Sequence, residues 1–525
     1  MILLYNGKLL SSLSVASALA IENDRIIAVG SDDEILNLYH PAVEKMDLGG
    51  RFVLPGITDS HIHLDLYGQA LQMVDCTAPT KEECLERVRV ESLQVPAGEW
   101  ITGHGWNQNQ WAGGFGTAKE LDNLIPGHPV FLADMSLHSA WVNSSALELA
   151  GISSSTPDPV GGIIQRDTVG NPTGILLEGA VNLVEKIIPP PSSLKRKQNL
   201  LAAQDRLLQY GITSVHDFDR IPCFSTLQEM SQEGNLILRV VKSLPFEQLA
   251  EAVSLGLHSG FGGQHLRIGP VKLFADGALG PQTAAMLAPY EGNPVNHGKL
   301  LLTADEIFEA GIHAGQSGLS LAIHAIGDRA TNEVLNGLSM LRTYEYQNHL
   351  PLLTHRIEHL QLLHPESLEM AAQLGLCASM QPVHLYADMK TADEHWGARC
   401  RYAFPFASLY SRGTLLIFGS DAPVETPNPF WGIHAAVTRK NRSNEHSQPP
   451  WHPQECLSVA DAIQCYTVNP ARQAGMENIL GKIKEGYLAD LLVMEQDPFT
   501  VPPDELYSLR PEMVMLDGRW VYHAG

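Results

Sequence analysis

Two histidines one residue apart, His61 and His63, follow a short apolar run and are the first side chains here that could hold a metal ion. Alternate side chains of a β-strand point to the same face, so a strand would direct both imidazoles to one point. A bound metal ion requires such convergence. The pair is a weak signal by itself, because 22 histidines are spread over 525 residues. It predicts a metal site only if other ligands follow along the chain.

Four further polar residues stand at or near the carboxyl ends of candidate strands, and these are Lys272, His324, His359 and Asp421. In a (β/α)8 barrel the groups that do chemistry lie at the carboxyl ends of the strands. The four residues therefore extend the histidine pair into a candidate site at one end of such a barrel.

The elements that would position these residues follow a βαβ rhythm, because the middle of the chain alternates strand-like and helix-like stretches. One βα unit of a barrel takes about 30 residues. The interval from His324 to His359 accommodates one unit, and the interval from His359 to Asp421 accommodates two. This count places the histidine pair on the first strand, Lys272 on the fourth, His324 and His359 on the fifth and sixth, and Asp421 on the eighth. The candidate strands are residues 211–216, 271–274, 319–324, 354–359, 376–380 and 414–419.

The two chain ends and one long insertion do not fit this rhythm. Each end has short alternating strands, too few for a stable sheet of its own. We therefore expect residues 1–54 and 473–525 to form one small composite β-sandwich domain, and residues 55–472 to form the α/β barrel. Residues from about 76 to 175 are rich in Gly, Trp, Asn and Pro, and we expect an insertion on the loop face of the barrel there.

The first 20 residues allow a second interpretation, because they are apolar and end in Ala18-Leu19-Ala20, like the cleavage site of a signal peptide. Asn6-Gly7 interrupts the run and is a turn signal. Two short strands, residues 2–5 and 8–10, are the favoured interpretation.

Composition narrows the class of protein and of partner. The apolar fraction of 44% and charged fraction of 18% are typical of a globular protein with a large core. The formal net charge of −23 argues against nucleic acid or an anionic membrane as partner. Seven widely spaced cysteines without a Cys-x-x-Cys pair form neither a disulfide framework nor a thiolate zinc site, so we expect a cytoplasmic protein. The expected partner is a small-molecule substrate, and a homo-oligomer remains open.

The chain resembles the metal-dependent amidohydrolase superfamily, in its YtcJ-like (amidohydrolase 3) branch, which contains deformylases of N-substituted formamides. The resemblance covers nearly the whole chain, and its motifs are specific as an ordered set. The matching stretches are residues 55–63, 138–144, 272–280, 324–330, 356–359, 419–423 and 486–491.

The resemblance implies a site for two divalent metals, most simply zinc. In it, His61 and His63 would bind the buried α metal, and His324 and His359 would bind the β metal. Lys272 would carry a carbamate derived from CO2 and bridge the two metals. A carbamate is anionic and suits this position, whereas a free lysine would repel a divalent cation.

The resemblance also implies a reaction. Asp421 would touch the α metal and act as general base and then general acid. A metal-bridging hydroxide would attack the carbonyl carbon of the substrate. The bond that breaks would be an amide-like carbon–nitrogen bond that is not a peptide bond. Two rival functions stay open, a mononuclear deaminase on the same barrel, which does not need Lys272, and a non-catalytic scaffold.

Each ligand assignment has a structural alternative. The histidine pair could lie in a surface turn, and His324 or His359 alone could be a core histidine with satisfied hydrogen bonds. Lys272 could be an ordinary salt-bridged lysine, although a free cation on a buried strand is costly. Asp421 could cap a helix.

Candidate substrate contacts are weaker. His138, Trp106 and Trp111 lie in the insertion and could form the substrate pocket or pack in a core. His216, at the end of a candidate third strand, could line the site or make a structural hydrogen bond. Gln381 follows the candidate seventh strand and is a further possible contact.

Overall fold

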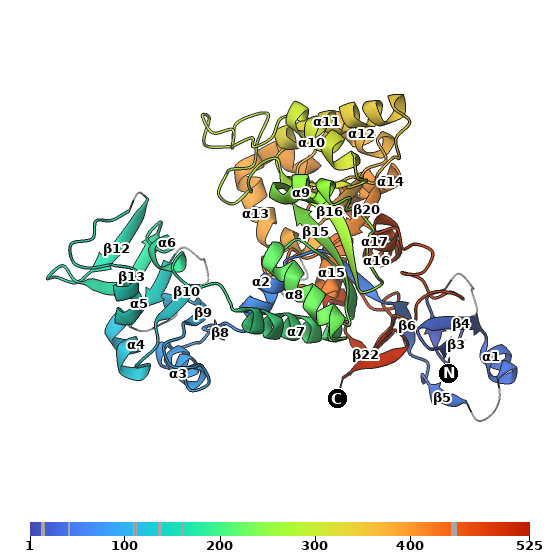
Figure 1. Ribbon diagram of the computed structural model, residues 1–525, viewed down its shortest axis with the longest axis horizontal. Coiled ribbons are helices and arrows are strands. Elements are labelled where there is room, and N and C mark those ends of the chain that lie inside the picture. Colours follow the sequence, from blue (N-terminus) through green and yellow to red (C-terminus); the bar gives the residue numbers. More distant parts are fainter. Residues whose placement is uncertain are drawn as a thin grey trace. The chain divides into compact units, whose positions relative to one another are not determined.

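The computed structural model describes residues 1–11, 16–39, 43–108, 111, 113–134, 139–159, 161–442 and 449–524. These residues form two compact units (Figure 1). The barrel unit comprises residues 1–68 and 197–525, and the insertion unit comprises residues 69–196.

An eight-stranded parallel sheet forms the centre of the barrel unit and confirms the predicted (β/α)8 class. Its neighbouring strands pair in chain order, and the backbone nitrogen of Asp421 closes the ring by donating to the carbonyl oxygen of His61 at 2.7 Å. The strands, in order, are β7 (Ile57–Ile62), β14 (Ile212–Asp217), β15 (Arg239–Pro245), β16 (Leu266–Phe274), β17 (Leu321–Ala325), β18 (Arg356–His359), β19 (Cys377–Met380) and β20 (Leu415–Phe418).

The helices between the strands pack against the barrel and against one another. In α10 (Ala304–Gly315), Thr303 and Glu306 form a capping box that starts the helix. A Cβ at Gly311 would lie 2.4 Å from the side chain of Leu341, so glycine lets α10 pack closely on α11 (Asp328–Gln347). The other α-helices that lie wholly or mostly in the barrel unit are α1 (Asp32–Leu38), α2 (Leu64–Leu71), α7 (Ser193–Gln209), α8 (Ile221–Gln232), α9 (Leu249–Ser254), α12 (Leu368–Gln373), α13 (Leu385–Trp396), α14 (Phe406–Ser411), α15 (Pro429–Thr438), α16 (Val459–Tyr466) and α17 (Val468–Gln473).

Both chain ends contribute to a composite β domain. One sheet, in the order β2-β6-β21-β22-β23, joins β2 (Lys8–Leu9) and β6 (Phe52–Pro55) to β21 (Leu491–Met494), β22 (Pro511–Leu516) and β23 (Arg519–His523). A second sheet, in the order β4-β3-β1-β5, contains β1 (Ile2–Tyr5), β3 (Ala18–Glu22), β4 (Arg25–Gly30) and β5 (Glu44–Asp47). Leu4, Leu19, Val53, Leu491 and Val493 belong to one buried cluster, so the two sheets share a core.

The two strands predicted on either side of Asn6-Gly7 are present as β1 and β2, which lie in different sheets. One expectation about strands needs correction. The strand that ends near His216 is the second of the barrel, because β15 had not been predicted and is the third. Arg239 and Lys242 interrupt the apolar pattern of β15, although both are buried.

The insertion unit has its own sheet and core. The sheet, in the order β12-β13-β11-β10-β9-β8, contains β8 (Val74–Asp75), β9 (Ile101–Trp106), β10 (Val130–Asp134), β11 (Ser139–Val142), β12 (Gly162–Arg166) and β13 (Pro172–Glu178). Its helices are α3 (Lys81–Ser92), α4 (Ala118–Leu124), α5 (Ser144–Leu149) and α6 (Asn182–Glu185). The long Gly- and Trp-rich stretch is therefore an ordered α+β unit.

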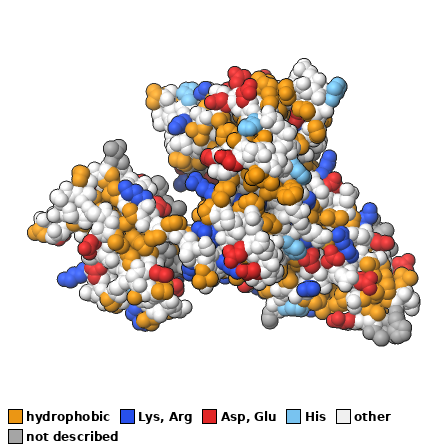
Figure 2. All heavy atoms as spheres, viewed as in Figure 1, with side chains coloured by type: hydrophobic (Ala, Val, Ile, Leu, Met, Phe, Trp, Pro, Cys, Tyr) orange, Lys and Arg blue, Asp and Glu red, His pale blue; other side chains and the backbone are white. Residues whose placement is uncertain are grey.

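The acidic side chains and the cysteines that the composition brought out can be located in the structure. Acidic side chains lie in several separate groups on the face shown in Figure 2. All seven cysteines are unpaired thiols. Among the described helices, none has the length and apolar character needed to cross a membrane.

Candidate metal centre

Three buried side chains converge at the carboxyl ends of the barrel strands. One potential ligand atom from each of His61, His359 and Asp421 lies within 4.8 Å of the other two. Oδ1 of Asp421 is 3.5 Å from Nε2 of His61 and 3.3 Å from Nε2 of His63. The histidine pair and the residue after β20 therefore face one centre.

The ring of His61 is held on two sides. Its Nδ1 donates to Oε2 of Glu358 at 2.6 Å, which directs Nε2 toward Asp421. Its face stacks on the ring of Phe218 with the centroids 4.1 Å apart. Burial lowers the pKa of His61 to about 4, so the imidazole is neutral at pH 7 and has a lone pair to offer.

His359 and His324 are oriented in a similar way. Nδ1 of His359 donates to Oε1 of Gln381 at 2.8 Å, and Nε2 of His324 donates to the carbonyl oxygen of Gly277 at 2.9 Å. The two rings meet edge to face with centroids 4.5 Å apart. Burial lowers the pKa of His324 to about 4 and that of His359 well below its usual range. Each ring keeps one unprotonated nitrogen for a ligand.

His63 and Asp421 form the charged part of the centre. Burial opposes the charge of His63, but hydrogen bonds to Asp219 and Asp421 outweigh it and raise its pKa to about 9. Burial would also raise the pKa of Asp421, yet His61, His63 and His359 hold it well below its usual range. Asp421 is therefore an anion that faces several imidazoles.

Lys272 is buried beside this cluster, with its Nζ 4.7 Å from the ring centroid of Phe218 and 5.0 Å from that of Phe274. Glu358 and Asp421 are the acidic groups whose charges act on this amine. Burial lowers the pKa of Lys272 to about 8. A fraction of its amine is therefore uncharged near neutral pH.

These residues fit a divalent metal. Imidazole nitrogens and a carboxylate are the donors that zinc prefers after thiolate. Metal-binding histidines usually donate their second N–H to a carboxylate, amide or carbonyl oxygen, and His61, His359 and His324 all do so. The donor set and its orientation thus match a metal centre.

A buried carboxylate that the sequence did not single out, Asp59, fixes the backbone of the centre. It accepts hydrogen bonds from the backbone nitrogens of His61 at 3.1 Å and Ser420 at 3.0 Å, and from Oγ of Ser420 at 2.6 Å. Burial raises its pKa to about 7. Asp59 ties β7 to the segment that carries Asp421. The signal in the sequence is its i, i+2 spacing from His61, which puts both on one face of a buried strand.

A second group of potential ligands consists of Asp217, Asp219 and Cys223. A positively charged side chain, that of Lys242, already lies beside this group. The ammonium of Lys242 lies 2.7 Å from Oδ2 of Asp217 and also donates to the carbonyl oxygen of Asp219. This lysine neutralises the group from inside the barrel, so we assign it no metal.

The structure places the other predicted contacts as follows. Trp106 and Trp111 are buried in the core of the insertion unit, and their indole nitrogens donate to the carbonyl oxygens of Leu132 and Ala78. His216 is buried and accepts from Nη1 of Arg356 at 2.9 Å. These are packing and structural roles. Gln381 lies behind His359, as described above, and His138 lies outside the described residues.

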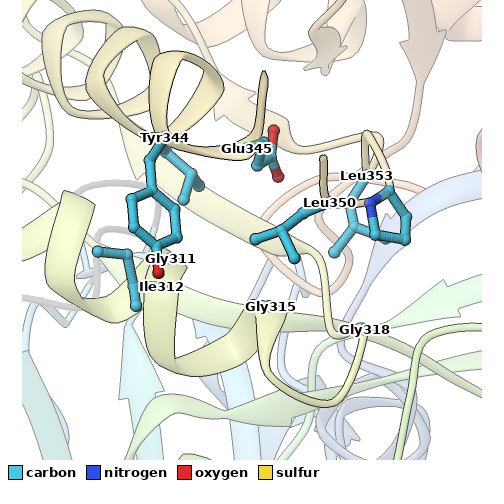
Figure 3. A pocket seen from close by; sticks show the side chains of 10 residues that line it. Gly311, Ile312, Gly315, Gly318, Tyr344, Glu345, Leu350 and Leu353 are labelled. Atoms are coloured by element: carbon cyan, nitrogen blue, oxygen red, sulfur yellow. The ribbon is translucent and has the colours of Figure 1, made fainter. Parts of the chain in front are cut away.

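A separate small hollow lies between α10, α11 and the loop after α11 (Figure 3). Its volume of about 30 Å³ suits one or two water molecules and not a substrate. Its lining includes Gly311, Tyr344, Glu345, Leu350 and Leu353.

Comparisons with known proteins agree with this geometry. The model of the amidohydrolase family (Amidohydro_3) matches residues 44–522. The chain is 34% identical to the protein named "Putative amidohydrolase YtcJ" of Bacillus subtilis over 96% of both chains. It is 28% identical to the N-substituted formamide deformylase of Arthrobacter pascens, over 96% of this chain and 94% of that protein. An uncharacterized metal-dependent hydrolase from Pyrococcus furiosus has the same fold, with a TM-score of 0.78, 32% identity, and coverage of 95% and 100% of the two chains.

Proposed function

This chain belongs to the amidohydrolase family, and we propose that it is a metal-dependent hydrolase of amide-like carbon–nitrogen bonds outside peptides. The observation that carries the proposal is the convergence of His61, His359 and Asp421 at the carboxyl ends of the barrel strands. In barrel enzymes this end of the sheet is where catalysis occurs.

The residues proposed to hold two divalent ions are His61, His63, Lys272, His324, His359 and Asp421. Bound there, the ions, in our proposal zinc, would supply Lewis acidity toward the substrate carbonyl and would make water more acidic.

Lys272 is proposed to act as a carbamate. Its uncharged amine nitrogen would form a bond to the carbon of CO2 and lose a proton, which leaves an anionic carboxylate on the side chain. The buried position and the lowered pKa of Lys272 support this step, because the reaction needs the neutral amine. The change from cation to anion would supply the negative charge that two divalent ions need.

Asp421 is proposed to move the proton. Its Oδ1 faces Nε2 of both His61 and His63, so the carboxylate is fixed beside the proposed reaction centre. It would accept the proton that the attacking water loses and deliver it to the leaving nitrogen as the carbon–nitrogen bond breaks. Its low pKa keeps it ionised for the first of these steps.

A second function, a mononuclear deaminase, is favoured by one observation. The converging group contains ligands for a single centre, two histidines and an aspartate, and does not include Lys272. Such an enzyme would release ammonia instead of an acid and a substituted amine.

A substrate panel tests the proposal. The zinc-loaded protein, the chelator-treated protein and the Asp421→Asn variant would be incubated with N-formyl and N-acyl amines, and with amino-substituted heterocycles. We expect zinc-dependent release of a carboxylic acid and an amine. The deformylase similarity makes N-substituted formamides the first choice. Zinc-dependent release of ammonia alone would favour the deaminase, and turnover that survives chelation would contradict both.

A further inference from the structure

One buried carboxylate of the centre, Glu358, is not among the predicted ligands. It lies on β18 directly before His359, is fully buried, and its Oε2 accepts from Nδ1 of His61 at 2.6 Å. Every donor found around this carboxylate is an N–H group, from the imidazole of His61 or the guanidinium of Arg356.

Arg356 supplies the positive charge that balances this carboxylate. Its Nε donates to Oε1 of Glu358, and its Nη2 donates to Oε2 at 3.0 Å. The same guanidinium donates to the carbonyl oxygen of Ser60 at 2.7 Å and to Oγ of Ser379 at 2.6 Å. Because these partners lie on β7 and β19, Arg356 ties Glu358, on β18, to two further strands of the barrel.

We propose that Glu358 is the positioning residue of the metal centre, which holds His61 as the tautomer with the proton on Nδ1 and leaves Nε2 for the metal. Arg356 holds the carboxylate in place through two hydrogen bonds. The proposal rests on the proposed function, since it assumes that His61 binds a metal. It adds a residue that the similarity to the family does not assign.

Replacing Glu358 by glutamine would disturb the hydrogen bonds to both of its partners. An amide presents one NH2 group and one oxygen, but both hydrogen-bond partners described for Glu358, His61 and Arg356, act as donors. If the amide nitrogen faces His61, Nδ1 must accept and the proton moves to Nε2, which can then no longer bind a metal. If it faces Arg356, two donors oppose each other in a dry interior.

The test compares Glu358→Gln with a matched control, Glu345→Gln. Glu345 is also buried, and its carboxylate lies 2.6 Å from Nη1 of Arg342 and 3.4 Å from Nε2 of His355. Glu345 and Arg342 belong to α11 and His355 precedes β18, so none of the three is a proposed metal ligand. Zn2+ affinity would be measured by competition with a chromophoric chelator, together with the visible spectrum of the Co2+-loaded protein and the melting temperature of the metal-free protein.

We expect Glu358→Gln to lower the affinity for Zn2+ about 10- to 100-fold and to alter the cobalt spectrum. Glu345→Gln should lower the melting temperature alone. Wild-type affinity in Glu358→Gln, or an equal loss in both variants, would overturn the inference while leaving the proposed function intact. Absence of Zn2+ binding by the wild-type protein would instead overturn both.

Glu358→Asp keeps the test decisive if the glutamine variant does not fold. The shorter carboxylate preserves the charge beside Arg356 but withdraws from Nδ1 of His61. We expect a loss of Zn2+ affinity with little change in the melting temperature of the metal-free protein. Unchanged affinity in this variant would count against a positioning role.

Discussion

At the scale of single residues, Asp421 carries the proposed proton transfer and has an unusual backbone. Its φ of +61° lies in the left-handed region, which asparagine also tolerates. Asp421→Asn should therefore leave the fold intact and lower turnover about 10²- to 10⁴-fold, because the acid/base group is lost. Turnover per folded molecule is the measurement.

A matched control exists for this variant. Asp517 also has a left-handed φ of +52° but belongs to the composite β domain. Asp517→Asn should change stability and not turnover. Wild-type turnover in Asp421→Asn would remove Asp421 from the mechanism.

Lys272 gives a prediction that distinguishes a carbamate from an ordinary lysine. Lys272→Ala should lose metal and activity, and a short carboxylic acid such as acetate or propionate should restore part of both by replacing the carbamate. Metal content and turnover are measured with and without the added acid.

The other buried lysine, Lys242, serves as control, because it already pairs with Asp217 at 2.7 Å. Lys242→Ala should lose stability, and no carboxylic acid should rescue it. Full metal retention in Lys272→Ala would contradict the carbamate bridge.

Individual residues could be predicted only in part. Each proposed ligand lies near the end of a barrel strand or shortly after it, so its type and spacing could be read from the sequence. Glu358 was part of a recognised stretch, yet only the structure shows that its carboxylate reaches His61, on a strand far away in sequence. For Trp106 and Trp111 the sequence left two alternatives open, because an aromatic residue in a Gly-rich segment has the same pattern whether it lines a pocket or packs in a core. The structure places both in the core of the insertion unit.

At the scale of elements, β7 and the segment after β20 must approach closely for the centre to form. A Cβ at Gly419 would lie 2.4 Å from the backbone nitrogen of His61 and 2.9 Å from its Cβ. We expect Gly419→Ala to lower the free energy of unfolding by about 1–3 kcal/mol through overpacking, and to weaken metal binding by displacing His61. Chemical denaturation and metal titration check these two effects.

Gly315 is the matching control, because a Cβ there meets nothing within 4 Å and the residue ends a helix. Gly315→Ala should leave metal affinity unchanged. Equal metal affinity in Gly419→Ala and the wild type would show that the close approach does not position His61.

Most predicted barrel strands start and end within one or two residues of those observed, but β16 starts at Leu266 and not at residue 271. One strand of the barrel was not predicted at all. This strand, β15, is buried along its length and contains Arg239 and Lys242, whose charges hide the strand in the sequence. Their partners, Asp490 and Asp217, come from other elements, so no local pattern could reveal that these charges are compensated.

At the scale of the molecule, a charged cluster joins the barrel to the composite β domain. Arg239 of β15 donates to Asp490 at 2.7 Å, and it also pairs with Asp517. His265 lies 2.8 Å from Asp517 on the same cluster. The pairing of strands from both chain ends could be predicted from the sequence, but this charged connection joins residues far apart in sequence and became visible only in the fold.

This cluster predicts a pH-dependent stability. The hydrogen bond to Asp517 raises the pKa of His265 above its usual 6.5, against the effect of burial. The charged histidine therefore stabilises the fold fully below about pH 6.5, and this contribution is lost as the pH rises through the higher pKa of the folded state. The difference in unfolding free energy between the wild type and His265→Gln should shrink over that range.

The Asp517→Asn background supplies the control, because it removes the partner that raises the pKa. There, His265→Gln should lose this dependence on pH. A difference that stays constant from pH 5 to 9 in the wild-type background would show that the ion pair does not contribute to stability.

The most direct test of the account is the number of metal ions that each chain binds. Protein purified without chelator, loaded with Zn2+ in the presence of bicarbonate and freed of excess metal, would be analysed by mass spectrometry of its metal content, alongside Lys272→Ala. We predict two ions per wild-type chain and a marked loss in the variant. One ion per chain in both proteins would contradict the binuclear centre and favour the deaminase, and no bound ion would contradict the metal-dependent hydrolase itself.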